Sequence, residues 1–190
     1  GKEVKIGDRV IVVGGGNVAM DAARTARRLG AKEVHAVCLE SPKEMPAHPW
    51  EIEEAREEGV QIENCWGPRQ ITTSDGKVAA AEFEKCTAVF DSQGKFNPTF
   101  DKSVTTKFGA DTVIIAIGQA TDTAALSGKS TIKTTRSGFV IVDPLTLATD
   151  EAGIFAGGDG VTGPKSAVEA IKHGHEAAIS IDRYLRKVDL

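Results

Sequence analysis

The clearest pattern in the sequence is a run of four β-branched residues at positions 10–13, Val-Ile-Val-Val. An unbroken apolar run of this kind is typical of a strand buried on both faces of a parallel sheet, so we predict a strand over residues 8–13. Glycines follow directly, and the alanine-rich stretch 18–29 predicts a helix that stops at Gly30. A second apolar strand over residues 34–39 completes a strand, turn, helix, strand unit.

The same alternation of elements continues beyond this unit. Pro49 suits the first residue of a helix that we predict over residues 49–58. Residues 60–63 predict a third strand, and the apolar stretch 111–117 predicts another buried strand that ends at Gly118. Strands that alternate with helices favour a parallel sheet.

A different pattern fills the middle and the end of the chain. Residues 71–89 alternate around an Asp75-Gly76 turn, which predicts an antiparallel hairpin, whereas the polar and turn-rich stretch 91–109 predicts a loop. Short strands are expected at 139–142 and 154–156, followed by a closing helix over 166–185. We therefore predict an α/β fold, a Rossmann-like three-layer domain with an antiparallel hairpin insertion, over residues 1–119, and a second segment over residues 120–190.

A glycine motif joins the first predicted strand to the first predicted helix. The pattern is Gly-x-Gly-x-x-Ala, and its residues are Gly14, Gly15, Gly16, Asn17, Val18 and Ala19. The first glycine permits the tight turn, the second lets the backbone approach a pyrophosphate, and the alanine lets helix and strand pack closely. Exposed N–H groups at the helix start attract a diphosphate. The alternatives are a turn without a ligand and a site for another nucleoside, such as S-adenosylmethionine.

A dinucleotide site also needs an acceptor for the adenosine ribose at the end of the second strand. Glu40 stands there, 21 residues after Ala19, close to the expected spacing of about twenty. A carboxylate accepts hydrogen bonds from the ribose hydroxyls and repels a 2′-phosphate, so it favours NAD over NADP. Lys43 is the nearby cation that could accommodate a 2′-phosphate. The alternative interpretation of Glu40 is a surface glutamate at the end of a strand that binds no ligand. Gly118 and Gln119, at the end of another predicted parallel strand, are the candidates for lining the nicotinamide side.

Composition narrows the class of protein further. A net charge of −4 and a pI near 5.6 argue against a nucleic-acid partner, and the arginines at 24, 27 and 28 are expected on a solvated helix face. The cysteines at 38, 65 and 86 are too far apart in sequence for a redox CxxC pair and are expected to be reduced. The longest apolar runs are far short of a membrane span, so we expect a cytoplasmic protein with no membrane contact.

Several stretches together resemble one family of proteins. These stretches are residues 14–24, Met45-Pro46, residues 54–60, residues 110–118 and residues 153–159. They resemble the small (beta) subunit of glutamate synthase and its relatives, the flavin subunits of ferredoxin:NADP transhydrogenases and the corresponding part of dihydropyrimidine dehydrogenase. The resemblance covers nearly the whole chain. It implies an oxidoreductase in which hydride passes from NAD(P)H to FAD, and then to iron–sulfur centres or a partner electron-transfer subunit.

The resemblance also implies roles for residues near the end of the chain. Residues 120–190 would be the C-terminal segment of an FAD-binding domain, following an NAD(P)-binding domain over residues 1–119. Gly158 and Asp159 would belong to the second FAD motif. The helix that starts at Ser166 and Ala167 would direct its N–H groups at the pyrimidine end of the flavin, where negative charge appears on reduction.

Two departures from the family pattern change the expectation. The FAD-binding glycine motif and the iron–sulfur cysteines of the family precede this region and are not in this sequence, so we expect an excised domain that retains FAD weakly and is inactive alone. Members that use NADPH resemble one another in carrying a basic pair where Leu39 and Glu40 stand, which strengthens the preference for NAD(H). A non-catalytic nucleotide-binding or scaffold module and a methyltransferase are the rival hypotheses. No catalytic acid or base and no metal ligand is predicted, because the cofactors carry the hydride chemistry.

Overall fold

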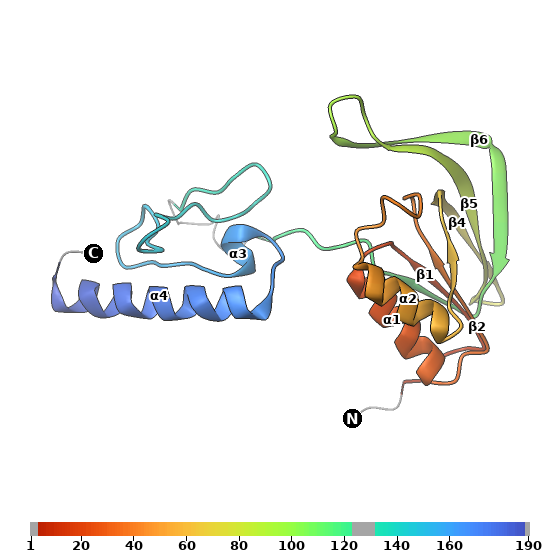
Figure 1. The fold of residues 1–190 in the computed structure, drawn as a ribbon, viewed down its shortest axis with the longest axis horizontal. Helices are drawn as coiled ribbons and strands as arrows, with labels where there is room; N and C mark the ends of the chain where they lie inside the picture. Colours follow the sequence, from red (N-terminus) through yellow and green to blue (C-terminus); the bar gives the residue numbers. More distant parts are fainter. Residues whose placement is uncertain (1–3, 123–131, 189–190) are drawn as a thin grey trace. The chain divides into compact units, whose positions relative to one another are not determined.

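In a computed structural model, which describes residues 4–122 and 132–188, the chain divides into two compact units. Unit 1 is Gly1–Gly118 and unit 2 is Gln119–Leu190. Figure 1 shows the helices and strands of both units. None of the helices within the described ranges is long and apolar enough to cross a membrane.

A four-stranded parallel sheet forms the centre of unit 1. Its strands are β1 (Arg9–Val13), β2 (Glu33–Val37), β3 (Gln61–Glu63) and β7 (Thr112–Ile115). They lie in the order β3-β2-β1-β7, and every neighbouring pair is parallel. The four strands expected from the apolar runs are thereby confirmed, and the sheet places the ends of β1, β2 and β7 along one edge.

Two helices cover one face of this sheet. They are α1 (Asn17–Arg28) and α2 (Pro49–Glu57). Val10 and Val12 of β1 pack with Ala19 and Met20 of α1 in a buried apolar cluster. Because alternate residues of a strand point to opposite faces, the other residues of β1 lie on the far side of the sheet.

A three-stranded antiparallel sheet forms the third layer on that far side. Its strands are β4 (Trp66–Ser74), β5 (Lys77–Phe90) and β6 (Phe96–Gly109), in the order β4-β5-β6. Ile11 and Val13 pack there against Phe83, which is fully buried. Figure 1 shows α1 and α2 on one side of the parallel strands and β4 to β6 on the other, so the Rossmann-like three-layer α/β architecture is confirmed.

The expected loop over residues 91–109 is wrong, because most of it is strand β6. The turn is confined to residues 91–95, where the Asp91 carboxylate accepts the backbone N–H groups of Gln93 and Lys95. The pairing of β5 with β6 then shifts: Glu84 faces Thr105, but the next residue, Lys85, faces Asp101. The bulge at 102–104 and the exposed polar side chains hide the strand pattern in the sequence.

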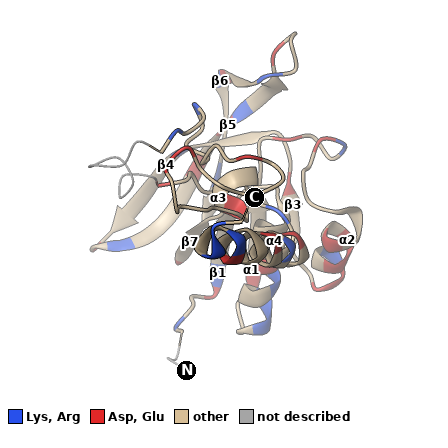
Figure 2. Ribbon diagram, turned by 90° about the vertical axis from the view of Figure 1, so that its left-hand side faces the viewer, with Lys and Arg blue, Asp and Glu red and all other residues tan. Residues whose placement is uncertain are grey.

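Ion pairs join α1 to α2, so the expectation of a solvated arginine face is wrong for Arg24, whereas the side chain of Arg28 is 62% exposed. Arg24, whose side chain is only 15% exposed, pairs with Glu51, Glu54 and Glu58 of the α2 region. Arg28 also pairs with Glu58. The pKa of Glu58 is lowered to about 2, mainly by the hydrogen bond from Arg28 and next by the hydrogen bond from Arg24. Figure 2 shows acidic residues along α2.

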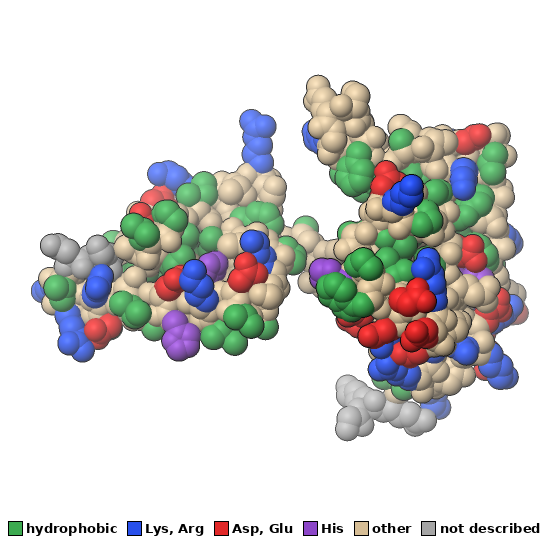
Figure 3. Space-filling model, in the orientation of Figure 1, with side chains coloured by type: hydrophobic (Ala, Val, Ile, Leu, Met, Phe, Trp, Pro, Cys, Tyr) green, Lys and Arg blue, Asp and Glu red, His purple; other side chains and the backbone are tan. Residues whose placement is uncertain are grey.

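The described residues of unit 2, 119–122 and 132–188, contain little regular structure before the final helix. Its helices are α3 (Asp159–Thr162) and α4 (Ala167–Arg186), and the strands expected at 139–142 and 154–156 appear only as isolated bridges, Thr134 with Val140 and Ala148 with Phe155. Val140 and Leu147 are the buried hydrophobic residues among the part of unit 2 that the structure describes. Apolar side chains of α4 are exposed (Figure 3).

Candidate nucleotide-binding site

The glycine turn begins at Gly14, which directly follows β1 and lies against the backbone just after β7. Gly14 has a φ of 144°, and a Cβ atom at this position would lie 2.3 Å from the carbonyl oxygen of Ala116. Its N–H donates to the carbonyl of Val37 at 2.9 Å. Both the backbone conformation and the available space therefore require glycine at position 14.

The next two glycines differ in what surrounds them. A Cβ atom at Gly15 would lie 2.8 Å from Oε2 of Glu40, whereas one at Gly16 would meet nothing nearer than Pro46 at 4.0 Å. Gly16 is the N-cap of α1. No side chain makes a capping hydrogen bond at this helix start, and the first turn contains no acidic residue. Gly16 is thus open on the side where a ligand could approach the backbone, while Gly15 is packed against the carboxylate of Glu40.

The first residues of α1 combine packing with exposure. Ala19 is fully buried against the sheet, and its side chain lies 3.3 Å from where a Gly14 Cβ would stand. Val18 is exposed, and the Asn17 side chain accepts a hydrogen bond from the backbone N–H of His48 at 2.8 Å. Asn17 therefore anchors the β2–α2 connection to the glycine turn. This role is visible only in the folded structure, because Asn17 and His48 are 31 residues apart in sequence.

This connection lies directly on the turn. The N–H of Ala47 donates to the carbonyl of Gly15 at 3.1 Å, and the side chains of Met45 and Ala47 are buried. The Met45-Pro46 break in the sequence thus marks a segment that packs on the glycine motif. Lys43 is exposed in the same connection.

Glu40 lies just after β2, and its backbone is held by several donors. Its carbonyl accepts the side-chain amide of Asn64 at 3.1 Å and the N–H of Cys65 at 3.1 Å. Asn64 also donates to the sulfur of Cys38 at 3.3 Å. Spacing alone identified Glu40, but Asn64 was missed because its partner is 24 residues away in sequence.

The cysteines, far apart in sequence, come close to this carbonyl. The thiols of Cys38 and Cys65 both point at the Glu40 carbonyl, and Cys86 donates its backbone N–H to Cys65. All three are free, as expected, and burial followed by the charge of Glu40 raises the pKa of Cys38 to about 12. Within the described residues, no group of three or more His, Cys, Asp or Glu side chains is arranged to hold a metal ion.

Gly118, the last residue of unit 1, follows the end of β7. It has a φ of 93°, and a Cβ atom there would have no neighbour within 4 Å. Gln119 is exposed and begins unit 2. β7 lies beside β1 in the sheet, so Gly118 follows the neighbour of the strand that leads into the glycine turn.

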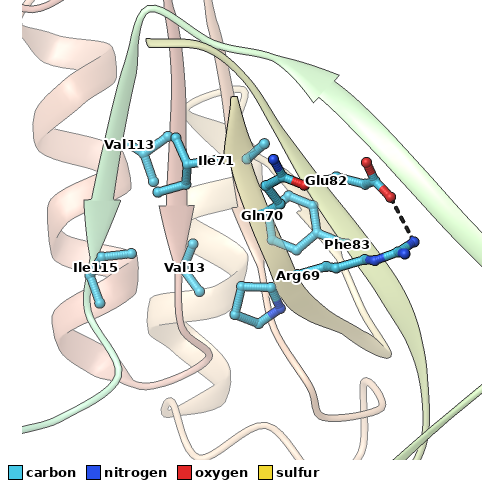
Figure 4. Close-up of a pocket in the computed structure, with 10 residues that line it drawn as sticks. Val13, Arg69, Gln70, Ile71, Glu82, Phe83, Val113 and Ile115 are labelled. Carbon is cyan, nitrogen blue, oxygen red and sulfur yellow. Dashed lines mark hydrogen bonds and ion pairs between the residues drawn. The ribbon is translucent and has the colours of Figure 1, made fainter. Parts of the chain in front are cut away.

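The apolar hollow drawn in Figure 4 lies on the face of the parallel sheet opposite to α1 and α2. It measures about 220 Å³ and lies between the two sheets, with Val13, Phe83 and Ile115 among its lining residues. Arg69 and Glu82, which also line it, form an ion pair at 2.9 Å. Its walls are largely apolar, which suits side-chain packing better than a charged pyrophosphate.

The second candidate region lies in unit 2. Gly158, with a φ of 65°, donates its N–H to Nδ1 of His173 at 2.9 Å, and Oδ1 of Asp159 accepts the N–H of Lys165 at 3.2 Å. Ser166 caps α4, which begins at Ala167. Its hydroxyl accepts the N–H of Glu169 while the Glu169 carboxylate accepts the N–H of Ser166. The turn and the helix start predicted from the sequence are thus held together by local hydrogen bonds.

A comparison with protein families gives a match over residues 2–174, to the pyridine nucleotide-disulphide oxidoreductases. The chain belongs to this family. Members of the family bind a pyridine nucleotide and FAD. The fold and the glycine turn described above agree with that membership.

Sequence relatives within this pyridine nucleotide-disulphide oxidoreductase family include subunits of larger enzymes. The chain is 42% identical over 182 residues to the beta subunit of the NADP(+)-dependent formate dehydrogenase of Moorella thermoacetica, covering 95% of this chain and 26% of that protein. It is 33% identical over 211 residues to the beta subunit of the NADPH-Fe(3+) oxidoreductase of Geobacter sulfurreducens, covering 98% and 31%. It is 34% identical over 181 residues to the glutamate synthase [NADPH] small chain of Azospirillum brasilense, covering 95% and 38%.

The resemblance to glutamate synthase small subunits is confirmed by these relatives. The chain spans about a quarter to two fifths of their lengths. Among solved structures, the thioredoxin reductase of T. acidophilum superposes with a TM-score of 0.76 at 20% identity, over 97% of this chain and 54% of that one. This likeness supports the fold.

Proposed function

We propose that this chain is the pyridine-nucleotide-binding part of a flavin-dependent oxidoreductase. In the complete enzyme, hydride passes from NADH, with NADPH second, to FAD, and electrons pass on to iron–sulfur centres or a partner subunit. The observation that carries the proposal is the packing of the Glu40 carboxylate against Gly15, beside the uncapped start of α1. It combines an acceptor for ribose hydroxyls with donors for a pyrophosphate at one place.

The start of α1 is suited to a diphosphate. The backbone N–H groups of Gly16, the N-cap, and of Asn17 and Val18 lie at the start of α1, where the helix carries a partial positive charge. The open space over Gly16 admits phosphate oxygens to the backbone. These features favour binding of the pyrophosphate at the turn over a glycine turn that has only a structural role.

Glu40 carries the proposed preference for NAD(H). An ionised carboxylate accepts hydrogen bonds from the ribose hydroxyls and opposes the negative charge of a 2′-phosphate. The relatives described above are named for NADP(+) or NADPH. The charge at position 40 is therefore the point at which this chain is proposed to differ from them.

The remaining site residues belong to the flavin side of the proposal. Gly118 and Gln119 would line the nicotinamide, and Gly158, Asp159, Ser166 and Ala167 would contact FAD. FAD, when bound, accepts the hydride from the nicotinamide. Since the capping box uses the N–H groups of Ser166 and Glu169, those of Ala167 and Val168 at the start of α4 would stabilise negative charge that develops on the flavin. Because Val140 and Leu147 are the only buried hydrophobic residues in the part of unit 2 that the structure describes, we expect the chain alone to retain FAD weakly and to be inactive.

The proposed organisation follows the same division. An NAD(P)-binding domain over residues 1–119 is followed by a C-terminal FAD-domain segment over residues 120–190. The partners are NAD(P)H, FAD and an N-terminal FAD/Fe–S domain or electron-transfer subunit, in the cytoplasm.

Calorimetric titration of the chain with NADH and with NADPH, and separately with FAD, tests the proposal. We expect NADH to bind more tightly than NADPH and FAD to bind weakly. Tighter binding of NADPH would contradict the preference assigned to Glu40. Absence of binding by both nucleotides would favour the alternative, a non-catalytic scaffold module.

The variant Glu40→Arg tests the role of this carboxylate. Reversing the charge should shift the NADPH/NADH affinity ratio toward NADPH on the order of tenfold or more, because charged hydrogen bonds contribute about 1.5–3 kcal/mol. Glu53→Arg makes the same charge change on an exposed part of α2 and should leave the ratio unchanged. An unchanged ratio in Glu40→Arg would show that Glu40 does not contact the ribose.

A further inference from the structure

Two aromatic rings are stacked on the surface where α2 begins. The rings of His48 and Trp50 lie 4.3 Å apart with an angle of 13° between their planes. Both side chains are exposed, and Trp50 exposes 58% of its surface. A large aromatic ring that is solvent-exposed and fixed in position can stack with another planar group.

The stack is held in place by the backbone on either side of it. His48 is the extended N-cap of α2, and its N–H donates to the side chain of Asn17 at 2.8 Å. Pro49, the first residue of α2, restricts the backbone between the two rings. Because little backbone freedom remains to be lost, a ligand that stacks here pays a small entropic cost.

The position of the stack relates it to the glycine turn. Asn17, which holds His48, is the first residue of α1, and the neighbouring N–H of Ala47 binds the carbonyl of Gly15. Gly15 in turn packs against the carboxylate of Glu40. Hydrogen bonds thus join the β2–α2 connection that carries the two rings to the glycine turn, and the proposed ribose acceptor packs on the same turn.

The other tryptophan is not available in this way. Trp66 is partly buried, it packs against the cluster between the two sheets, and the ammonium group of Lys85 lies 4.7 Å from the centre of its ring. The ring of Trp66 is therefore already in contact with other parts of the protein. Trp50 has one face against His48 and a large exposed surface.

We propose that the His48–Trp50 stack is the aromatic wall that receives the adenine base of the dinucleotide, an inference that rests on the proposed nucleotide site. Adenine is flat and presents a π face, so it stacks on an aromatic ring without needing a matching set of hydrogen bonds. The carboxylate of Glu40 then selects the ribose while the rings bind the base. The stack contributes affinity that NAD and NADP share.

Fluorescence of Trp50 tests this inference directly. The chain has two tryptophans, so Trp66→Phe leaves Trp50 as the sole tryptophan. Titration of this variant with ADP-ribose, which carries adenine, should change the Trp50 emission. Nicotinamide mononucleotide, which lacks adenine, should leave it unchanged. A response to both ligands or to neither, at concentrations where calorimetry shows ADP-ribose bound, would overturn the inference.

Affinity gives a second measurement, made in the otherwise unaltered chain. Trp50→Ala should weaken ADP-ribose and NADH binding by about tenfold, whereas Trp50→Phe, which keeps a ring, should stay within about threefold. Urea midpoints confirm that both variants are folded. If Trp50→Ala binds ADP-ribose and NADH as tightly as the unaltered chain does, the proposed role of the ring is overturned, although the nucleotide site itself is supported. Failure of the unaltered chain to bind NADH or ADP-ribose would instead overturn the proposed function, and this inference with it.

Discussion

Unit 1 and unit 2 of the chain are stabilised by different means. In unit 1, a parallel sheet is covered on one face by α1 and α2 and on the other by an antiparallel sheet. One buried apolar cluster lies between the helices and the parallel sheet, and another lies between the two sheets. In unit 2, the described residues contribute only Val140 and Leu147 to the buried hydrophobic set. Its shape depends on backbone bridges and on polar caps, such as the Asp143 carboxylate that accepts the N–H groups of Leu145 and Thr146.

The difference shows which part of the chain can hold a rigid site. Burial of apolar surface is the main favourable term in folding, and segments with few buried contacts open at low free-energy cost. The glycine turn and Glu40 rest on the packed layers of unit 1. The Gly158 turn and the start of α4 rest on local hydrogen bonds, while Val168 and Ile171 of α4 remain exposed.

The largest expected effect comes from removing a core side chain from each unit. Phe83→Ala should lower the free energy of unfolding of unit 1 by about 3–5 kcal/mol, because it empties the centre of the cluster between the sheets. Leu147→Ala, the matched change in unit 2, should leave unit 1 unaffected. Both tryptophans lie in unit 1, so their fluorescence during urea unfolding reports this unit. An equal shift of the midpoint in Leu147→Ala would show that the units unfold together.

The next effect separates folding from binding within unit 1. Gly14→Ala should cost about 2–4 kcal/mol, because the new methyl group meets the Ala116 carbonyl and the φ of 144° is strained for alanine. Gly16→Ala should change stability by less than about 1 kcal/mol, since its methyl group has space, but it should weaken NADH binding by blocking the approach to the backbone. Urea unfolding and calorimetry measure the two effects. NADH binding that survives Gly16→Ala unchanged would contradict the position of the pyrophosphate.

A smaller effect is expected from acid. The pKa of Glu58 is lowered to about 2 by Arg28 and Arg24, so its contribution to stability is complete above about pH 4.5. This contribution is lost as the pH falls from there toward 2, because the carboxylate becomes protonated. Thermal unfolding of the unaltered chain and of Glu58→Gln should therefore differ at pH 6 and converge near pH 2–3. A difference that is independent of pH would indicate that the ion pairs between α1 and α2 do not stabilise unit 1.

The smallest effect is local to unit 2. His173→Ala removes the acceptor of the Gly158 N–H and should speed hydrogen exchange at this amide, whereas His173→Asn offers a replacement oxygen and should restore part of the protection. Exchange in unit 1 should not change. Equal exchange rates at Gly158 in all three proteins would show that the hydrogen bond does not order the turn.

The sequence predicts those parts of the fold in which one residue pattern has one structural meaning. The β-branched run at 10–13 predicts a doubly buried strand, and the glycines after it predict the turn to α1. Strand β6 escapes prediction because its side chains are mostly exposed and a bulge interrupts its alternation. Period-two patterning requires one buried face, and β6 barely has one.

At the candidate site, a residue is predictable from the sequence where a fixed spacing places it. Glu40 follows a strand at a fixed distance from the glycine turn, so spacing identifies it. Asn64, the cysteines near the Glu40 carbonyl, and the contact of Asn17 with His48 depend on segments that are distant in sequence. The pairing of Arg24 with three glutamates likewise requires α1 and α2 to lie side by side.

The outer edge of β6 has a consequence for the behaviour of the protein in concentrated solution. β6 is the edge strand of its sheet, and a long regular edge would offer unpaired N–H and C=O groups to a strand of another molecule. Pro98 removes one donor, the bulge at 102–104 breaks the straight row, and Lys102 and Lys107 place charge along it. These interruptions make β6 a poor template for aggregation, so they protect this edge of the sheet from self-association.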